Sequence, residues 1–293
     1  MKIKLLTALT AALLTAGAAQ AELVDFSQYN NIYHVSTSGS DSNTGTAQDP
    51  FATIKQAITI AQSGDAISIG AGQFDATLTR QSYNYGYYYQ TGLNNQNKDI
   101  DFIGTAGQTT LYIDGAAAPS RDIHFFSGRG ISRIYGLSFI RDTTGRGQTY
   151  RNAIFGGEVN VEVYNSVFKS INTNVISMTY NNNSSSNVLV SNSAFDINGN
   201  ATGFSASYSG SGPNVVIKNS ASNIDFNYDR GTTYINNATG VTFDENYNIT
   251  SGETDVGVYS GANAWNVNAP VALGFLALGG MVFSGSRRKK NAQ

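Results

Sequence analysis

The stretch NVEVYNSVF (160–168) returns as NVLVSNSAF (187–195) and again as NVVIKNSAS (214–222). Its sixth residue is an asparagine that belongs to an evenly spaced row with a period of 27: Asn165, Asn192, Asn219 and Asn246. Before that asparagine, apolar and polar residues alternate, which is the pattern of a β-strand with one buried face. The chain therefore repeats one structural unit.

The segment SRIYGLSF (132–139) fits the same frame at an offset of 29, with Gly136 in place of the asparagine. Glycine and asparagine both tolerate the left-handed backbone conformation, so we expect a sharp bend after each strand. Downstream, Val241 and Phe243 match the frame at an offset of 26, whereas Asn246 matches it at 27. This difference predicts a single-residue bulge before the last bend.

A unit of this size cannot bury its apolar face alone, so successive units must stack, with each strand pairing with its copy in the next coil. Stacked asparagines would then hydrogen-bond along the axis as a ladder, and we assign them no chemistry. The sequence therefore predicts an all-β fold, a parallel β-helix.

The composition agrees with a solenoid rich in turns, because 13% of the residues are charged, 31 are glycine and only 4 are proline. There is no cysteine, so disulfides and thiolate chemistry are excluded. Residues 22–266 carry 12 Lys and Arg and 20 Asp and Glu, and 12 minus 20 gives a net charge of −8. Such a surface argues against nucleic acid as a partner.

Both ends of the chain have the pattern of export signals. Residues 1–21 contain Lys2 and Lys4, an apolar run and a small-residue site, which predict a secretory signal peptide cleaved after Ala21. The C-terminal segment contains Pro270, an apolar stretch and the basic cluster RRKK (287–290). The apolar stretch 269–286 is near the lower length limit for a bilayer span, which predicts a transmembrane helix with the basic cluster in the cytoplasm.

This tail resembles the PEP-CTERM sorting signal, which exosortase-type enzymes of Gram-negative bacteria process during export of surface or biofilm-matrix proteins. The Pro-Glu-Pro of that family stands here as Asn-Ala-Pro (268–270). The resemblance implies a Gram-negative source, an exosortase-type partner, processing near Pro270, and a location at the cell surface or outside the cell. Without processing, the tail would remain as a plain membrane anchor.

A second resemblance lies in YHVSTSGSDSNTGTAQDPFATIKQAITIAQSGDAISIGAGQF (33–74). This stretch is similar to the opening of pectate-lyase-like right-handed β-helix proteins, including the DUF1565 group. The resemblance implies a right-handed parallel β-helix, the hand that parallel crossovers overwhelmingly adopt. It also implies a strand at 33–36, a polar loop, a capping helix at 53–62 and a first full coil at 66–69. The residues support the helix independently, because Ile54, Ala57, Ile58 and Ala61 fall at helical spacing.

A cap matters because an uncovered coil presents its backbone edge to other chains. Together with the two ends, these features predict a signal peptide (1–21), a β-helix domain (22–255), a linker (256–266) and a sorting tail (267–293). We expect one globular domain.

Enzymes that share this fold act mostly on acidic polysaccharides, through outward side chains of neighbouring coils. Such sites use carboxylates that hold calcium with an Arg or Lys as base, or paired acids for hydrolysis. The aligned coils give two outward columns that stack neither acids nor bases: Glu162, Leu189 and Val216, then Tyr164, Ser191 and Lys218. The candidate catalytic residues are instead three cations: Arg133, Arg141 and Lys169.

Two arrangements give these cations a different role. An Arg-rich stretch could line a groove for a polyanion: Arg133, Arg141, Arg146 and Arg151, with Asp142. Lys169 lies one coil from Asp196, which an exposed salt bridge explains without catalysis. An enzyme predicts that Arg133, Glu162 and Lys169 converge in one groove, whereas a scaffold predicts scattered pairs.

Carboxylate pairs that could hold a cation are Asp99 with Asp101, Glu158 with Glu162, Asp225 with Asp229, and Asp244 with Glu245. None has the spacing of an EF-hand or of a glycine-aspartate calcium repeat, and a solvated surface explains each of them. We therefore predict no metal site and no cofactor, although calcium stays compatible with these pairs. The two histidines, His34 and His124, are interpreted as packing residues.

Five tyrosines are concentrated in SYNYGYYYQTGLNN (82–95): Tyr83, Tyr85, Tyr87, Tyr88 and Tyr89. The segment interrupts the coil spacing, so we expect a projecting loop. Tyrosine offers a flat apolar face and a hydroxyl, which suits sugar stacking, and these residues are candidates for substrate binding. Alternatively, they fold back over the coils or pair as strand residues.

Three functions remain open. The protein is an exported structural or adhesive surface component, or it binds polysaccharide through the tyrosines, or it is a polysaccharide lyase or glycoside hydrolase acting on an extracellular acidic polysaccharide. The expected partners are an extracellular polysaccharide or a surface protein, an exosortase-type enzyme, and the membrane through the tail. Only the resemblance of the fold supports catalysis, so we favour the structural or binding role.

Overall fold

The computed structural model describes residues 24–75, 79–82, 88–105, 107–114, 122–142, 153–171, 176–178, 187–198, 204–206, 214–223, 232–238, 242–243 and 249–251. The predicted signal peptide, linker and sorting tail lie outside these ranges, and so do the proposed processing positions Ala21 and Pro270. Among the described residues, no helix has the length and apolar character needed to cross a bilayer.

Most of the described chain is β-structure. In chain order the elements are η1 (Phe26–Gln28), β1 (Ile32–Val35), α2 (Ile54–Ile60), β2 (Ala66–Ile69), β3 (Gly72–Asp75), β4 (Thr79–Ser82), β5 (Tyr88–Asn94), β6 (Asp101–Ile103), β7 (Thr109–Asp114), β8 (Asp122–Tyr135), β9 (Ser138–Asp142), β10 (Ala153–Tyr164), β11 (Val167–Ile171), β12 (Ile176–Met178), β13 (Asn187–Ser191), β14 (Ala194–Asn198), β15 (Phe204–Ala206), β16 (Asn214–Ser222), β17 (Thr232–Ala238), β18 (Thr242–Phe243) and β19 (Ile249–Ser251).

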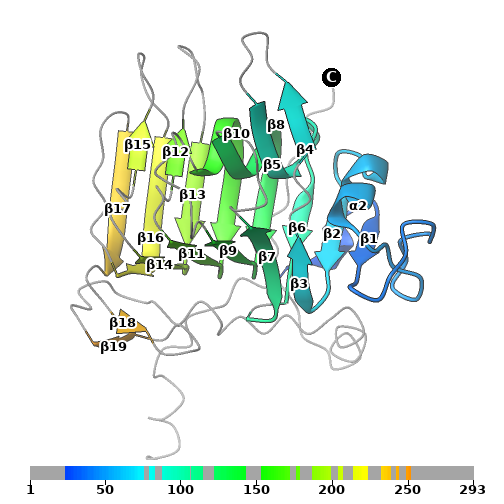
Figure 1. Cartoon of the computed structure of the whole chain (residues 1–293), viewed down its shortest axis with the longest axis horizontal. Helices are drawn as coiled ribbons and strands as arrows, with labels where there is room; N and C mark the ends of the chain where they lie inside the picture. Colours follow the sequence, from blue (N-terminus) through cyan, green and yellow to red (C-terminus); the bar gives the residue numbers. More distant parts are fainter. Residues whose placement is uncertain are drawn as a thin grey trace, which may run out of the picture.

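Two stacks of parallel strands form the walls of a parallel β-helix. The first stack is β1-β2-β6-β8-β10-β13-β16-β17, and the second is β3-β7-β9-β11-β14. They meet at β16, which continues around the bend and pairs with both β13 and β14. Figure 1 shows the first stack side by side along the molecule, with the second stack crossing below it. The predicted solenoid is thus confirmed, while its handedness stays a prediction.

The strand register reproduces the sequence period. Val161 pairs with Val188 and Val188 pairs with Val215, so each valine lies opposite its own copy in the next repeat. The upstream copy follows its longer offset, because Ser132 pairs with Val161. The bends are also as predicted, since Asn165, Asn192 and Asn219 have φ of 51°, 47° and 49°, and Gly136 has φ of 63°. The repeated asparagines therefore occupy the left-handed conformation that most residues avoid.

Polar ladders follow each bend. Asn192 donates from Nδ2 to Oδ1 of Asn165, which confirms the predicted asparagine ladder between these two coils. The next residue of each repeat forms a second ladder: the Ser166 N–H donates to Ser193 Oγ at 3.2 Å, and the Ser193 N–H donates to Ser220 Oγ at 3.1 Å. All three serines are buried, so their hydroxyls satisfy backbone groups that water cannot reach.

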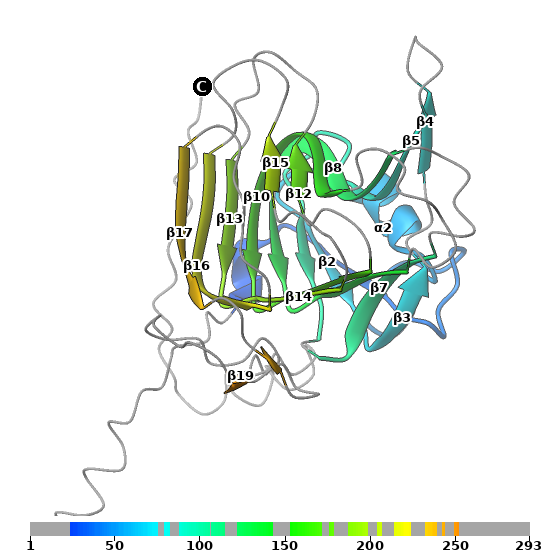
Figure 2. The same cartoon turned by 60° about the vertical axis from the view of Figure 1, so that its left-hand side comes forward.

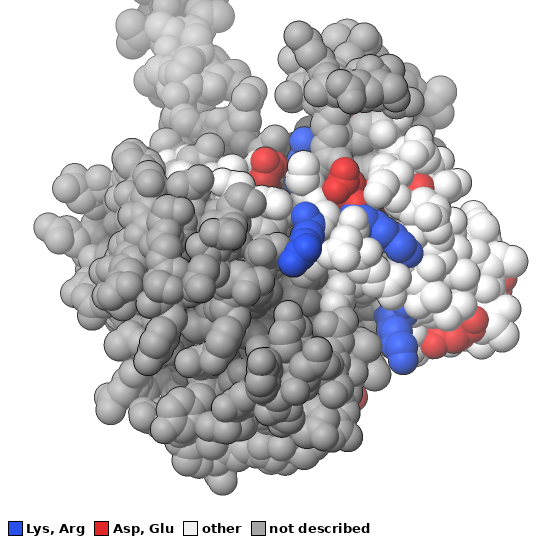
Figure 3. Space-filling view, turned by 90° about the horizontal axis from the view of Figure 1, so that it is seen from above, with Lys and Arg blue, Asp and Glu red and all other residues white. Residues whose placement is uncertain are grey.

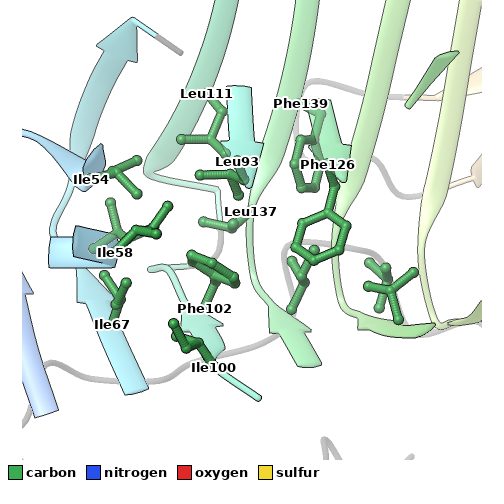
Figure 4. Close-up of a cluster of buried hydrophobic side chains, with 14 of the residues drawn as sticks. Ile54, Ile58, Ile67, Leu93, Ile100, Phe102, Leu111, Phe126, Leu137 and Phe139 are labelled. Atoms are coloured by element: carbon green, nitrogen blue, oxygen red, sulfur yellow. The ribbon is translucent and has the colours of Figure 1, made fainter. Parts of the chain in front are cut away.

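A continuous apolar column fills the inside of the helix. The rings of Phe139 and Phe168 stack at 5.2 Å, and those of Phe168 and Phe195 stack at 4.9 Å. All three rings are fully buried. Toward the N-terminal end the column continues through larger, less regular packing, in which Phe102 and Phe126 meet edge to face at 6.0 Å (Figure 4). Burial of this column supplies the main stabilisation of the fold.

Helix α2 covers the N-terminal end of the column, as predicted. Ile54 and Ile58 point from α2 toward the buried side chains of the first coils (Figure 4). Thr53 caps the helix by accepting from the Gln56 N–H at 3.1 Å. At the other end, Lys98 donates from Nζ to the carbonyls of Ile58 and Ala61, at 3.0 and 2.7 Å. A cation at the helix C-terminus therefore ties the cap to the segment that leads into β6.

The C-terminal end differs from the prediction. The strand that stacks on β16 is β17, whose Ile235 pairs with Ile217, so this coil is markedly shorter than the repeat. The register shift lies between Lys218 and Ser220, around the Asn219 bend. Phe243, expected in the next coil, lies in an antiparallel pair of strands, β18 and β19. Asn246 and Val241 lie outside the described residues. The sequence missed this coil because its segment, TTYINNA, lacks the repeated asparagine-serine pair.

Candidate functional site

Outward side chains of the first stack form two adjacent columns. One contains Ala66, Asp101, Arg133, Glu162, Leu189 and Val216. The other contains Ile103, Tyr135, Tyr164 and Ser191. The predicted columns through Glu162 and Tyr164 are thus confirmed, and the structure extends them toward the N-terminal end. Asp101, Arg133, Tyr135, Glu162 and Tyr164 lie together and are called the Arg133 cluster below.

The centre of this cluster is an ion pair between neighbouring coils. Arg133 Nε lies 3.2 Å from Glu162 Oε2, which also accepts a hydrogen bond from the Tyr164 hydroxyl at 3.0 Å. The Tyr164 ring stacks on Tyr135 with centroids 5.2 Å apart and planes 14° apart. The side chain of Arg133 is 20% exposed and that of Glu162 is 39% exposed. A partly exposed donor and acceptor therefore lie beside an aromatic stack.

Residues 24–29 cross the outward face of the first stack and are called the N-terminal strap. Val24 packs into a small apolar cluster with Ala66, Ile103 and Tyr135, against which Phe26 and Tyr29 also lie. The strap turns through η1, where the Asp25 carboxylate accepts from the Ser27 N–H at 3.0 Å. In Figure 2 this dark blue turn lies behind the long strands. The strap therefore covers the coils on the N-terminal side of Glu162.

The strap also makes polar contacts with the Arg133 cluster. The Tyr29 hydroxyl donates to Asp101 Oδ2 at 2.9 Å, and Asp101 Oδ1 accepts from the backbone N–H of Arg133 at 2.8 Å. Arg133 Nη1 donates to Gln28 Oε1 at 3.4 Å. Asp101 is buried, and both of its carboxylate oxygens take part in this network. Its orientation is therefore fixed.

The environment keeps these groups in defined protonation states. Burial and the adjacent Asp101 carboxylate raise the pKa of Tyr29 well above its ordinary value, so the phenol stays a donor. Burial alone opposes the charge of the Arg133 guanidinium, but Tyr135, Asp101 and Glu162 outweigh it and raise the pKa of Arg133. Arg133 thus remains a cation and is poorly suited to removing a proton.

The other candidate cations lie in the second stack. Lys169 Nζ is 3.3 Å from Asp196 Oδ2, which is the inter-coil salt bridge considered above. Arg141 lies in β9, where it pairs in register with Ser170 and Ile113, and its side chain lies outside the description. Arg146 and Arg151 also lie outside it. The structure therefore brings Arg133 and Glu162 together and places Lys169 in a separate pair.

In the view of Figure 3, cations and carboxylates of the described surface lie next to each other.

The described ends of the tyrosine-rich segment lie in two paired strands, while the expected loop at 83–87 lies outside the described residues. β4 and β5 pair antiparallel, with Tyr88 opposite Ser82 and Tyr89 opposite Gln81, and β5 also pairs with β8. Tyr88 and Tyr89 are therefore strand residues, which is the alternative the sequence left open, and the hairpin extends beyond the coils in Figure 2. Their side chains, and Tyr83, Tyr85 and Tyr87 as a whole, lie outside the described residues.

Of the described acids that were considered for cation binding, Glu162 pairs with Arg133, and Asp99 and Asp101 bond to the backbone. The carboxylates of Asp99 and Asp101 accept from the N–H groups of Ile131 and Arg133, both at 2.8 Å. Asn97 accepts from the next alternate N–H, that of Arg129, at 3.0 Å. Side chains of the preceding coil thus accept hydrogen bonds from β8 that the backbone carbonyls of a neighbouring strand would otherwise accept. Within the described ranges, no group of three or more His, Cys, Asp or Glu is placed to hold a metal ion.

The polar loop of the N-terminal segment has a structural role as well. Asp41 accepts from the N–H groups of Ala52 and Thr53, at 3.1 and 2.8 Å, and thereby fixes the start of α2. His34 lies in β1, and burial lowers its pKa. The side chains of His124 and Glu158 and the acid pairs beyond residue 223 lie outside the description.

Sequence reasoning missed part of this site. Asp101 was considered only with Asp99, and Tyr29, Gln28 and the strap were not considered. A signal was available, because the apolar residues of the strap follow directly after the predicted cleavage site and precede the first strand. The stacking of Tyr135 on Tyr164 could also have been read from the alignment of SRIYGLSF with the later repeats.

The comparisons with known proteins concern the fold. A family model described as a protein of unknown function, DUF1565, matches residues 37–82, which supports the resemblance predicted for this segment. None of the curated proteins matches the chain. A solved structure of a rhamnogalacturonan lyase is 15% identical and covers 66% of this chain and 68% of its own, with a TM-score of 0.45. The pectate lyase Pel9A is 13% identical and covers 74% and 71%, with a TM-score of 0.35. Identities this low say nothing about the activity of this chain.

Proposed function

We propose that the protein is an exported β-helix protein that binds extracellular polysaccharide at the Arg133 cluster and serves as a structural or adhesive component of the cell surface or matrix. The observation that carries this proposal is the partly exposed Arg133–Glu162 pair on the outward face of the first stack. The half-buried Tyr164 bonds to Glu162 through its hydroxyl, and the aliphatic residue Leu189 is the register partner of Glu162 in the next coil. This combination of apolar and hydrogen-bonding groups matches the two kinds of surface that a sugar ring presents.

The chemistry of the cluster favours binding over cleavage. A lyase needs a base that accepts a proton from the substrate, whereas the surroundings of Arg133 raise its pKa. A glycosidase needs two carboxyl groups on either side of the scissile bond. Here Asp101 is buried under the strap, and both of its oxygens accept hydrogen bonds from the protein. Glu162 is thus the carboxylate of this cluster that faces solvent most.

The location of the protein is proposed from its two ends. Residues 1–21 have the pattern of a secretory signal, and residues 267–293 have the apolar stretch and basic cluster of a sorting tail or membrane anchor. Such a tail would hold the stiff solenoid at the surface, with an exosortase-type enzyme as a processing partner. The polysaccharide-binding face would then be presented outside the cell.

The test uses the full chain, expressed with its own N-terminal segment and purified in mild detergent. It is incubated with neutral and acidic polysaccharides, with and without calcium, and both retention and chain length are followed. We expect retention without cleavage, which a Tyr164→Ala substitution weakens. Cleavage of any polymer would replace this proposal with the lyase or hydrolase alternative, and the absence of all retention would refute polysaccharide binding.

A further inference from the structure

The charge balance of the Arg133 cluster points to the class of sugar that it accepts. Its described charged side chains are one cation, Arg133, and two carboxylates, Asp101 and Glu162, so its net charge is −1. Farther along β8, Asp99 and the exposed Arg129 add one charge of each sign, so this balance does not change. A cluster with this balance does not attract a further anion.

The hydrogen-bonding capacity of Arg133 is partly used. Its Nε faces Glu162 and its Nη1 donates to Gln28 in the strap. A guanidinium has five N–H donors, so donors remain for a neighbouring acceptor. Glu162 Oε2 pairs with Arg133 and accepts a hydrogen bond from the Tyr164 hydroxyl. An ionised carboxylate has a second oxygen and several lone pairs, so Glu162 can accept a further hydrogen bond. The pair thus presents a donor and an acceptor side by side.

From this arrangement we infer that the cluster selects uncharged sugars by binding two adjacent hydroxyl groups of one ring. One hydroxyl donates to Glu162 and the next accepts from Arg133, while the C–H face of the ring lies against Tyr164 and Leu189. This inference rests on the proposed polysaccharide binding and names its ligand: a neutral pyranose with vicinal hydroxyls. The acidic polysaccharides that enzymes of this fold mostly cleave would not be preferred.

A uronate is disfavoured by the same contacts. Its carboxylate would have to take Arg133 from Glu162 and would then lie near Glu162 and the fixed Asp101. Asp101 cannot turn away, because the Tyr29 hydroxyl and the Arg133 N–H hold its two oxygens. Like charges at this spacing repel each other, and losing the ion pair leaves a carboxylate without its cation. The strap therefore contributes to selectivity through Tyr29 and Gln28.

The experiment compares matched neutral and uronic-acid oligosaccharides on the full chain by calorimetry at constant ionic strength. The wild type should bind the neutral oligosaccharide more tightly. Glu162→Gln removes one negative charge and replaces the carboxylate by a neutral, weaker amide acceptor, so the affinity for the neutral sugar should fall about tenfold and the affinity for the uronate should rise. The control, Asp196→Asn, removes the same charge from the ion pair with Lys169 in the second stack and should change neither affinity.

The outcomes separate the two proposals. If the wild type binds the uronate as tightly as the neutral sugar, or Glu162→Gln weakens both equally, the inferred selectivity is wrong and polysaccharide binding stands. If neither sugar binds, the proposed function fails and the inference with it. Tyr164→Phe is a second variant in case Glu162→Gln unfolds, because it keeps the ring and removes only the hydroxyl bonded to Glu162. It should lower the affinity for the neutral sugar without a change in the melting temperature greater than a few degrees.

Discussion

The coils from β10 to β16 and the coils from β2 to β8 share one strand frame but use it differently. The later coils repeat the same residues, so that Asn165, Asn192 and Asn219 all occupy the left-handed bend. The earlier coils replace the asparagine by Gly136 and add long side chains at outward positions. Regular coils therefore stabilise the solenoid, and the candidate site lies where the irregular coils meet the first regular one, β10, which supplies Glu162 and Tyr164.

The outward columns show this difference most directly. Toward the C-terminal end they contain Leu189, Val216 and Ser191, which offer little chemistry. Toward the N-terminal end the same positions hold Glu162, Arg133 and Asp101, with the strap laid across them. A repeat supplies a frame in which a few substitutions at equivalent positions create a charged and aromatic cluster without altering the core.

The largest expected effect concerns the phenylalanine column inside the solenoid. Phe168 is fully buried and stacks between Phe139 and Phe195, so Phe168→Ala should lower the free energy of unfolding by about 3–5 kcal/mol. Urea unfolding followed by circular dichroism measures this loss. Ile131→Ala is the control, because Ile131 is 48% exposed and its truncation should cost no more than about 0.5 kcal/mol. Equal losses in both variants would show that the phenylalanine column is not the main support.

The second prediction separates backbone from side chain at the bend. Asn192→Ala should lower the free energy of unfolding by about 1–2 kcal/mol, because alanine resists a φ of 47°. Asn192→Gly removes the same ladder hydrogen bond but suits that conformation, so it should cost less. Thermal unfolding of the two variants makes the comparison. If glycine costs as much as alanine, the asparagine ladder outweighs the left-handed bend.

Sequence reasoning succeeded where a residue type has one structural use. Asparagine and glycine at the bends, alternating valines in the strands and the spacing of Ile54, Ala57 and Ile58 in the cap each follow from a local rule, and the structure confirms them. It failed where a coil departs from the repeat. β17 has no asparagine-serine pair and follows β16 after a shorter interval than the repeat, so only its pairing with β16 places it.

The site was harder to predict for a physical reason. Arg133 and Glu162 could be joined by the repeat, since they occupy equivalent positions of neighbouring coils. The contacts of Tyr29 with Asp101 and of Gln28 with Arg133 join parts of the chain that are far apart in sequence, and they depend on how the strap crosses the sheet. No period in the sequence encodes that crossing. Contacts outside the repeat frame are therefore the ones that only the structure supplies.

The third prediction tests how much the hydrogen bond between Tyr29 and Asp101 contributes to holding the N-terminal strap. Tyr29→Phe keeps the ring against Tyr135 and removes the hydroxyl bonded to Asp101, so it should lower the free energy of unfolding by about 1 kcal/mol. Ser27→Ala is the control, because that hydroxyl bonds only to Asp25 within the strap in the described contacts. Chemical unfolding at neutral pH measures both. An unchanged stability in Tyr29→Phe would mean that the strap is held by its apolar contacts alone.

The smallest expected effect concerns His34 at the N-terminal end. Burial lowers the pKa of His34 in the folded state, whereas in the unfolded chain it is about 6.5. As the pH falls below about 6.5, the unfolded state therefore binds a proton that the folded state does not, and the free energy of unfolding decreases toward the folded pKa. His34→Gln cannot titrate, so its stability should change less between pH 7 and 5.5, and the difference between the two pH profiles isolates the histidine from the carboxylates that both proteins share. If the stabilities of the two proteins depend on pH in the same way, the His34 ring is exposed to water. The N-terminal end would then be packed less tightly than the regular coils.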